Sequence, residues 1–189
     1  MNQLIKSRKA LATVVTTLII LVVAVLLAGV VVFYAINVTS TRVQEESLQI
    51  QRQHIWHNGQ GFAEGAFLVS NTGGRDVVMD KISVRGQECA WSTVYFNRMA
   101  TVESGDLTYV TPNVGDTLTG LSVTIGATTY DFTPATGALI LQSGHSMLVY
   151  ITNPDSVAVN DVGVTIGITI FTANAQYYKE CNVEATLVP

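Results

Sequence analysis

The sequence predicts an α+β fold, in which a long N-terminal hydrophobic α-helix is followed by an all-β sandwich that forms a head domain. The first observation is that no charged residue occurs between Lys9 and Arg42 of the 189-residue chain. A run of that length is typical of a helix that crosses a membrane. The second is that, beyond Arg52, short runs rich in Val, Ile, Thr, Phe and Tyr alternate with clusters of Gly, Asn, Asp and Pro. That alternation is typical of strands and turns.

Charge is segregated along the chain. Lys6, Arg8 and Lys9 precede the apolar run, whereas every Asp and Glu follows it, beginning with Glu45. By the positive-inside rule, the N-terminus stays in the cytoplasm and the head lies outside the cell. The formal net charge is −4, and the part of the chain after the apolar run is more acidic still. This balance argues against a nucleic-acid partner.

The apolar run is longer than a membrane anchor requires. As a helix it extends for roughly 48 Å, whereas a bilayer core needs only about 20 residues. A secretory signal peptide has an apolar region of only about 7 to 15 residues, so this run is too long for one. Beyond the run, Ile36, Val43 and Ile50 recur at seven-residue spacing among polar residues. We therefore expect one helix over residues 11–52, first apolar on all sides and then amphipathic.

The residues at the start of this helix resemble a known family. SRKA followed directly by LATVVTTLIILVVAVLLAGVVVFYAINV is similar to the N-terminus of archaeal type IV pilins and the related archaellins. In that family, a prepilin peptidase removes a short basic leader, the class III signal peptide, at the cytoplasmic side of the apolar stretch. The resemblance implies a leader peptide over residues 1–10, with basic Arg8 and Lys9 and small Ala10 before the cut. The new N-terminus is then Leu11.

The resemblance also implies a function. In the family, the apolar helix spans the cytoplasmic membrane as a single-pass precursor with its N-terminus inside, and later packs with copies of itself as a filament core. The implied partners are further copies of the chain in a homo-oligomeric helical filament, the prepilin peptidase, an assembly ATPase and a membrane platform protein. The expected product is an extracellular type IV pilus-like filament at the cell surface for adhesion or surface attachment. A motility role as an archaellum subunit is a less favoured outcome.

Two other classes of protein remain open. The first is a single-pass, membrane-anchored extracellular β-sandwich that acts as a binding module. The second is an anchored enzyme, which the sequence disfavours, because it contains no GxSxG, HExxH, CxxC or phosphate-binding glycine motif. We therefore expect no enzymatic activity and no cofactor.

The head, residues 53–189, is predicted to be an immunoglobulin-like sandwich of eight or nine strands. In VGVTIGITIF, Val and Ile at every second position from Val162 to Ile170 are expected to share one buried face. SNTGGRD and TNPDS are expected to be turns, the first similar to the hairpin of pilin-like heads. The other expected strands are Phe62–Val69, Val77–Val84, Ala90–Phe96, Leu107–Val110, Leu121–Ile125, Thr129–Phe132, Met147–Ile151 and Tyr177–Val183.

The chain has two cysteines, Cys89 and Cys181, and both lie in the head. An exterior compartment permits a disulfide, and an even number of cysteines favours pairing. The bond closes a loop of about 90 residues, which in the chain-entropy model stabilises a protein by roughly 4 to 5 kcal/mol. We expect the disulfide, with two unpaired buried thiols as the alternative.

His54 and His57 are the two histidines nearest each other in sequence. On a helix, their spacing places both rings on one face, as in a metal site, whereas on an extended chain they face opposite ways. We expect two polar residues at the junction of helix and head, and no metal site.

Two further motifs have ordinary explanations. In NPDSVAVND, Asn153, Asp155, Asn160 and Asp161 carry oxygen atoms suited to calcium, but the EF-hand spacing is absent, so we expect a solvated turn. Asn37 begins the sequon Asn-Val-Thr, but lies within the expected helix. We expect Asn37 to be unmodified.

Overall fold

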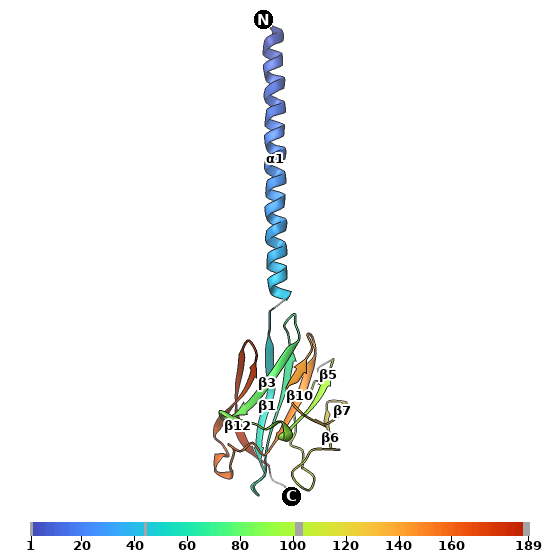
Figure 1. Ribbon diagram of the computed structural model, residues 1–189, viewed down its shortest axis with the longest axis vertical. Coiled ribbons are helices and arrows are strands. Elements are labelled where there is room, and N and C mark those ends of the chain that lie inside the picture. Colours follow the sequence, from blue (N-terminus) through green and yellow to red (C-terminus); the bar gives the residue numbers. More distant parts are fainter. Residues whose placement is uncertain (1, 44, 101–103, 187–189) are drawn as a thin grey trace. The chain divides into compact units, whose positions relative to one another are not determined.

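The fold consists of one apolar helix followed by a mostly β head (Figure 1). Within the chain, contacts separate two compact units, Met1–Val43 and Gln44–Pro189. The predicted α+β layout is confirmed. The computed structural model describes the backbone of residues 2–43, 45–100 and 104–186, and the side chains of residues 11–41, 45–100 and 104–186.

Helix α1 (Asn2–Val43) ends earlier than its sequence pattern predicts. The expected helical continuation to Arg52 is wrong, because Leu48 already begins strand β1 (Leu48–His57). Leu48 and Ile50 are buried whereas Gln49 between them is exposed, which is the alternation of a strand. The seven-residue spacing of Ile50 was therefore coincidental. Burial in the head core decides the conformation of this segment.

Ten strands of the described residues form one mixed sheet in the order β4-β3-β11-β12-β1-β2-β10-β5-β8, with β9 paired to β3. A separate hairpin contains β6 and β7. The remaining bounds are β2 (Ala63–Asn71), β3 (Val77–Val84), β4 (Gln87–Glu88), η1 (Trp91–Thr93), β5 (Val94–Met99), β6 (Ser122–Ile125), β7 (Thr128–Asp131), β8 (Thr133–Pro134), β9 (Leu139–Leu141), β10 (Ser146–Thr152), η2 (Val159–Asp161), β11 (Thr165–Thr172) and β12 (Gln176–Ala185).

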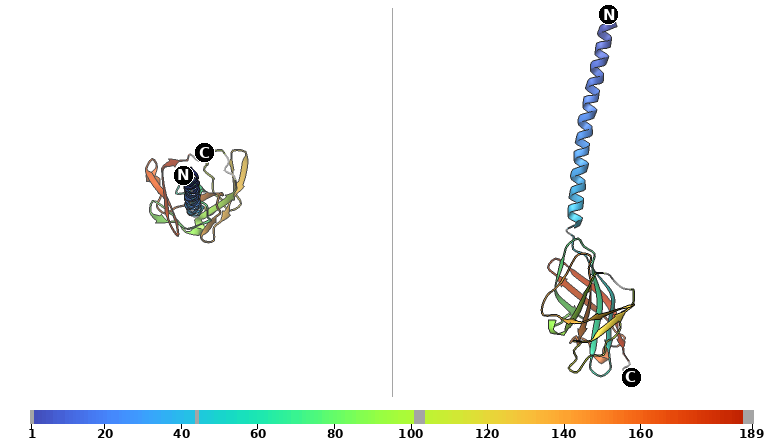
Figure 2. Two further views of the ribbon diagram at one scale, coloured as in Figure 1. Left: turned by 90° about the horizontal axis from the view of Figure 1, so that it is seen from above. Right: turned by 90° about the vertical axis from the view of Figure 1, so that its right-hand side faces the viewer.

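The sheet curls so that its two halves face each other (Figure 2). One half contains β1, β2, β10 and β5, and the other contains β3, β11 and β12. The parallel pairing of β1 with β12 joins them, whereas the neighbouring pairs are antiparallel. The main core lies between the halves and includes Ile55, Phe67, Ile82 and Ile168. The head is thus sandwich-like, but it is one continuous sheet instead of two separate immunoglobulin-like sheets.

Most expected strands correspond to observed ones, but three of the expected strands and one turn differ. No strand forms over Leu107–Val110, and the expected strand at Ala90–Phe96 starts with the 3-10 turn η1. The SNTGGRD turn does not form a hairpin, because β2 and β3 on either side of it pair with different strands. In the VGVTIGITIF stretch, Ile166, Ile168 and Ile170 are buried as expected, whereas Val162 and Val164 precede β11 and are exposed.

A second core cluster lies on the other side of the β2–β10–β5 sheet. Its residues come from those strands and β1, from the β6–β7 hairpin and the residue that follows it, and from the connecting segment 104–121. It contains Trp56, Ala66, Leu68, Tyr95, Met99, Leu107, Leu118, Val123, Ile125, Phe132, Leu148 and Tyr150. This cluster makes the head thicker than a simple two-layer sandwich.

Candidate functional site

The most prominent feature is the apolar surface of α1. The stretch Leu11–Thr41 is long and apolar enough to cross a membrane, and none of its most apolar window is buried within the chain. Its large side chains point outward on every side of the helix, including Leu21, Val30 and Phe33. Water does not tolerate such a surface, so it requires lipid or other protein around it.

The polar side chains of this stretch do not interrupt its apolar character. The hydroxyls of Thr16 and Thr41 donate to the carbonyls of Ala12 and Asn37, each at 2.9 Å. The Asn37 side-chain amide donates to the Phe33 carbonyl, also at 2.9 Å. Because these groups are satisfied by the helix's own backbone, burying them in an apolar environment costs little.

The expected leader-processing residues, Arg8, Lys9, Ala10 and Leu11, lie within the backbone of α1. The side chains of the first three lie outside the described residues, and that of Leu11 is exposed. Cleavage between Ala10 and Leu11 stays a prediction, as does the unmodified state of Asn37.

The structure contradicts the expected disulfide between Cys89 and Cys181, because both thiols are free. Cys89 follows β4, whereas Cys181 lies on β12, which is separated from β4 by β3 and β11. Three interstrand steps of about 4.8 Å exceed the Cα separation of about 7 Å that a disulfide can bridge. Burial raises the pKa of each thiol to about 11, so both are mostly protonated at neutral pH.

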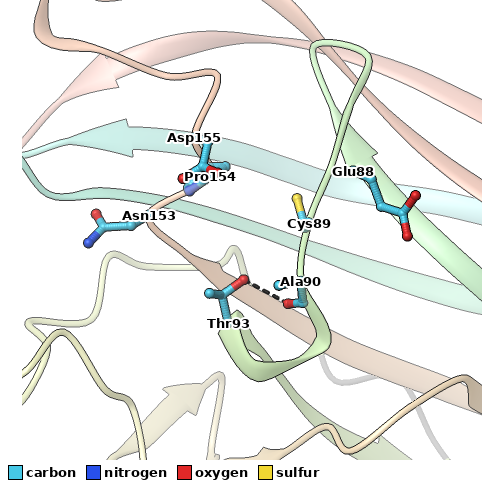
Figure 3. Close-up of a pocket in the computed structure, with 7 residues that line it drawn as sticks. All are labelled: Glu88, Cys89, Ala90, Thr93, Asn153, Pro154 and Asp155. Carbon is cyan, nitrogen blue, oxygen red and sulfur yellow. Dashed lines mark hydrogen bonds between the residues drawn. The ribbon is translucent and has the colours of Figure 1, made fainter.

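A small pocket of about 40 Å³ lies beside Cys89, and its lining comes from the β4–η1 turn and the loop after β10 (Figure 3). The Glu88 carboxylate and the Asn153 amide both point away from the Cys89 sulfur (Figure 3). Cys89, with its raised pKa, is a poor nucleophile and a poor metal ligand. This pocket has room for about one water molecule and provides no reactive group.

The candidate calcium oxygens of the TNPDS loop and η2 are directed at different partners. Asn153 accepts from the Ala63 N–H at 3.0 Å and donates to Asp116 at 2.8 Å. Asp161 accepts from Arg85 at 2.8 Å and from the Ala158 N–H at 2.8 Å. Among the described residues, no three His, Cys, Asp or Glu side chains form a group suited to a metal ion.

The two neighbouring histidines lie on strand β1 and point to opposite faces of the sheet, as expected for an extended chain. A β-bulge between Gln51 and His54 places two β1 residues opposite one of β2. Because of this extra residue, Ile50 and Ile55 face the main core although they are five positions apart. His57 is buried and accepts a hydrogen bond from the Gly59 N–H at 2.9 Å, whereas His54 faces the second cluster's side.

His54 lies between two carboxylates that the sequence did not bring together. Its Nε2 is 3.0 Å from Asp106 Oδ1, and its Nδ1 is 3.1 Å from Glu184 Oε1. The ring stacks on Trp56, with centroids 5.1 Å apart, and the Trp56 N–H donates to the other oxygen of Glu184. These residues come from β1, β12 and the 104–121 segment, so no local sequence motif announces them.

A buried carboxyl, Glu64, is also missed by the sequence motifs. It lies on β2 with no exposed surface, and its Oε1 accepts from the Val110 N–H at 3.0 Å. Its Oε2 is buried without a hydrogen-bond partner. Burial raises the pKa of Glu64 to about 8. Its one sequence signal is that Glu64 is the single charged residue of the strand AEGAFLVSN.

The comparisons with known proteins identify no family. No family model and no curated protein matches the chain. A solved structure described as "Copper-bound PCuAC domain from PmoF2" is 16% identical, and the match covers 76% of this chain and 100% of that chain. Its TM-score is 0.33, and a likeness at this level carries no functional argument.

Proposed function

We propose that this chain is the structural subunit of an extracellular type IV pilus-like filament, with α1 as the filament core and the head on its outside. The observation that carries the proposal is the apolar surface of Leu11–Thr41, whose most apolar window is fully exposed among the described residues. Adhesion or surface attachment is the proposed role, and no enzymatic role is proposed.

The energetics of this helix favour assembly. If neighbouring helices bury about 800 Å² of apolar surface per subunit, the gain is on the order of 20 kcal/mol before entropic and ordering costs. The side chains of Thr16, Asn37 and Thr41 already donate to backbone carbonyls of the helix, so burying them against neighbouring helices leaves these donors with a partner. The same helix is therefore suited first to lipid and then to a protein core.

The second candidate function is a single-pass membrane anchor for an extracellular binding module. The same apolar stretch favours it, since 31 residues are enough to cross a bilayer. The two functions differ in what surrounds the helix in the final state. An anchor stays in lipid as a monomer, whereas a filament subunit loses its leader and packs against copies of itself.

Substituting Leu21, whose side chain is exposed midway along the apolar stretch, separates these functions. In cells that contain a prepilin peptidase, we expect Leu21→Asp protein to reach the membrane. The free energy of inserting an Asp at the middle of a membrane helix is unfavourable by only about 2.5 to 3.5 kcal/mol. We also expect this variant to be cleaved but to form no filaments, because a filament core offers the carboxylate no partner or water. Electron microscopy of sheared surface material and intact-mass analysis provide the measurements.

Two matched variants control for the chemistry of this change. Leu21→Met keeps the size and apolarity of the side chain, and Val114→Asp places the same charge at a fully exposed position of the head. Both should form filaments with subunits that begin at Leu11. Normal filaments from Leu21→Asp would show that α1 is not the filament core. Wild-type protein that keeps Met1 and forms no filaments would favour the anchor instead.

A further inference from the structure

The 104–121 segment covers the second core cluster without belonging to the sheet. It forms no helix or strand of its own and contains one isolated bridge between Asn113 and Thr117. Leu107 and Leu118 of the segment are buried in the cluster. The Tyr150 hydroxyl donates to the Thr108 carbonyl at 2.9 Å. A segment held mainly by side chains can detach without breaking a β-ladder.

The first contact that holds this segment against the sheet is the one between Asp106 and His54, and it depends on a proton on His54. Both ring nitrogens face carboxylate oxygens, one of Asp106 on the segment and one of Glu184 on β12. Carboxylates accept hydrogen bonds but do not donate them, so both contacts form only when both nitrogens carry a proton. A neutral ring has one N–H and therefore loses one of the two contacts.

The electrostatics of His54 agree with this geometry. Burial by itself lowers the pKa of the ring, but the hydrogen bonds and charges of Asp106 and Glu184 outweigh burial and raise it above 6.5. Conversely, the hydrogen bond to His54 is the largest cause that lowers the pKa of Asp106, and the nearby charge of Arg52 adds to it. The imidazolium thus stabilises the docked position of Asp106.

The second contact that holds the segment against the sheet is the one between Val110 and Glu64, and its burial depends on a proton on Glu64. The segment contributes one hydrogen bond to this carboxyl, from the Val110 N–H, and the other carboxyl oxygen has no partner. Across the sheet its neighbours are Trp56 on β1 and Thr152 on β10. An ionised carboxylate in this position lacks water and compensating charge, which is costly.

Among the described residues, no positively charged group offsets the effect of burial on the pKa of Glu64. The phenols of Tyr109 on the segment and Tyr150 on β10 both sense its charge. The negative charge of Asp116 also raises the pKa of Tyr109, and that of Asp106 raises the pKa of Tyr150, so the other charges near these phenols are negative as well. Ionisation of Glu64 therefore favours any movement of the segment that admits water.

We propose that the 104–121 segment is a proton-dependent cover over the second core cluster, which stays docked while His54 and Glu64 both carry a proton and is released as the pH rises. Both groups act in the same direction, although one is a base and the other an acid. Release uncovers apolar residues of the sheet, among them Trp56 and Leu148.

The pH range of release follows from proton linkage. The pKa of Glu64 is 4.5 when exposed and about 8 when covered. Between these values the docked state holds one proton more than the released state, so docking weakens as the pH rises and levels off above about pH 8. The raised pKa of His54 adds a loss of the same sign, which begins above its ordinary value of 6.5.

Amide hydrogen exchange on the full-length chain in detergent micelles tests this proposal. Between pH 5 and pH 6.5, we expect the protection of amides in residues 107–121, corrected for intrinsic exchange rates, to fall about tenfold per pH unit. Above pH 6.5 it should fall more steeply, because His54 adds its own loss to that of Glu64. Amides of β11 in the other half of the sheet report on the global fold and should keep their protection. Loss of β11 protection in parallel with the segment would mean global unfolding and would overturn the proposal.

Two variants separate the contributions of the two groups. Glu64→Gln keeps an oxygen for the Val110 N–H but cannot ionise, so the fall below pH 6.5 should disappear. His54→Gln should keep the fall that Glu64 causes up to about pH 8 and lose only the additional His54 contribution above pH 6.5, and the double variant should show no pH dependence. The proposal is wrong if both single variants keep the wild-type pH profile. Loss of β11 protection in Glu64→Gln at pH 5 would mean that this variant does not fold. The comparison of His54→Gln with the wild-type pH profile then still tests the proposal.

Discussion

Two phenylalanines show how differently the sequence is used in the two units. Phe33 of α1 has 71% of its surface exposed, whereas Phe67 of β2 has none exposed. In the head, apolar side chains alternate with polar ones and are covered by the chain itself. In the described side chains of the helix, residues 11–41, apolar groups point in all directions and are exposed. The head therefore completes its own fold, whereas the helix needs other molecules around it to be stable.

The largest expected effect comes from replacing each phenylalanine by alanine. Phe67→Ala should destabilise the head by about 3 to 5 kcal/mol, because it opens a cavity in the main core. Phe33→Ala should leave the free energy of unfolding of the head unchanged within about 0.5 kcal/mol. Denaturant titration of the full-length protein in micelles, followed by the circular dichroism signal of the β-sheet, provides the measurement. Equal effects from the two variants would mean that the helix is part of the head's cooperative unit.

A matched pair of glycines gives a smaller effect with opposite signs. A Cβ at Gly73 would lie 2.5 Å from the Glu45 carbonyl oxygen, whereas a Cβ at Gly29 has no atom within 4 Å. Gly73→Ala should therefore cost about 1 to 3 kcal/mol, since backbone atoms must move. Gly29→Ala should favour the helix by up to about 1 kcal/mol. The unfolding midpoint of the head and the helical circular dichroism signal should thus move separately, and a stabilised head in Gly73→Ala would contradict the packing described.

The smallest effect concerns the thiols of the head. A pKa of about 11 instead of 9.0 leaves a hundredth of the usual thiolate, and the greater nucleophilicity of a more basic thiolate recovers about tenfold. Alkylation of Cys89 and Cys181 in the folded protein at pH 8 should be at least about tenfold slower than alkylation of Val114→Cys, which introduces a fully exposed thiol. Mass spectrometry of the unreduced protein should also find two free thiols, and a linked Cys89–Cys181 peptide would contradict the structure.

The sequence predicts the helix and most strands because these depend on local patterns. The apolar run marks α1, an alternating pattern marks β11, and short runs rich in apolar residues mark β3 and β10. It fails where a distant partner decides the outcome. Leu48–His57 combines a heptad-like spacing with an alternating pattern, and the neighbours β2 and β12 select the strand. In the same way, Cys89 and Cys181 satisfy every local criterion for pairing but lie three strands apart.

The candidate sites follow the same rule. The apolar surface of α1 is visible in the sequence because consecutive residues create it. The arrangement of His54 between Asp106 and Glu184 requires β1 to lie next to β12, and the 104–121 segment to fold back over the sheet. Asp106 lies 52 positions after His54 in the sequence, and Glu184 lies 78 positions after Asp106. Residues so far apart share no local pattern, so only the fold brings this cluster together.

The position of β1 has a mechanical consequence. Tension that reaches the head through the helix enters at Glu45–Ser47 and passes directly into β1, which has β2 on one side and β12 on the other. The entry point is itself held, because Glu46 accepts hydrogen bonds from Thr172 and Asn174, and the Thr72 N–H donates to the Ser47 carbonyl at 2.9 Å. Pulling β1 out of the head requires the ladders on both of its sides to break, whereas an edge strand such as β4 is held by one. The chain therefore places a strand that is held on both sides at the point where a pulling load arrives.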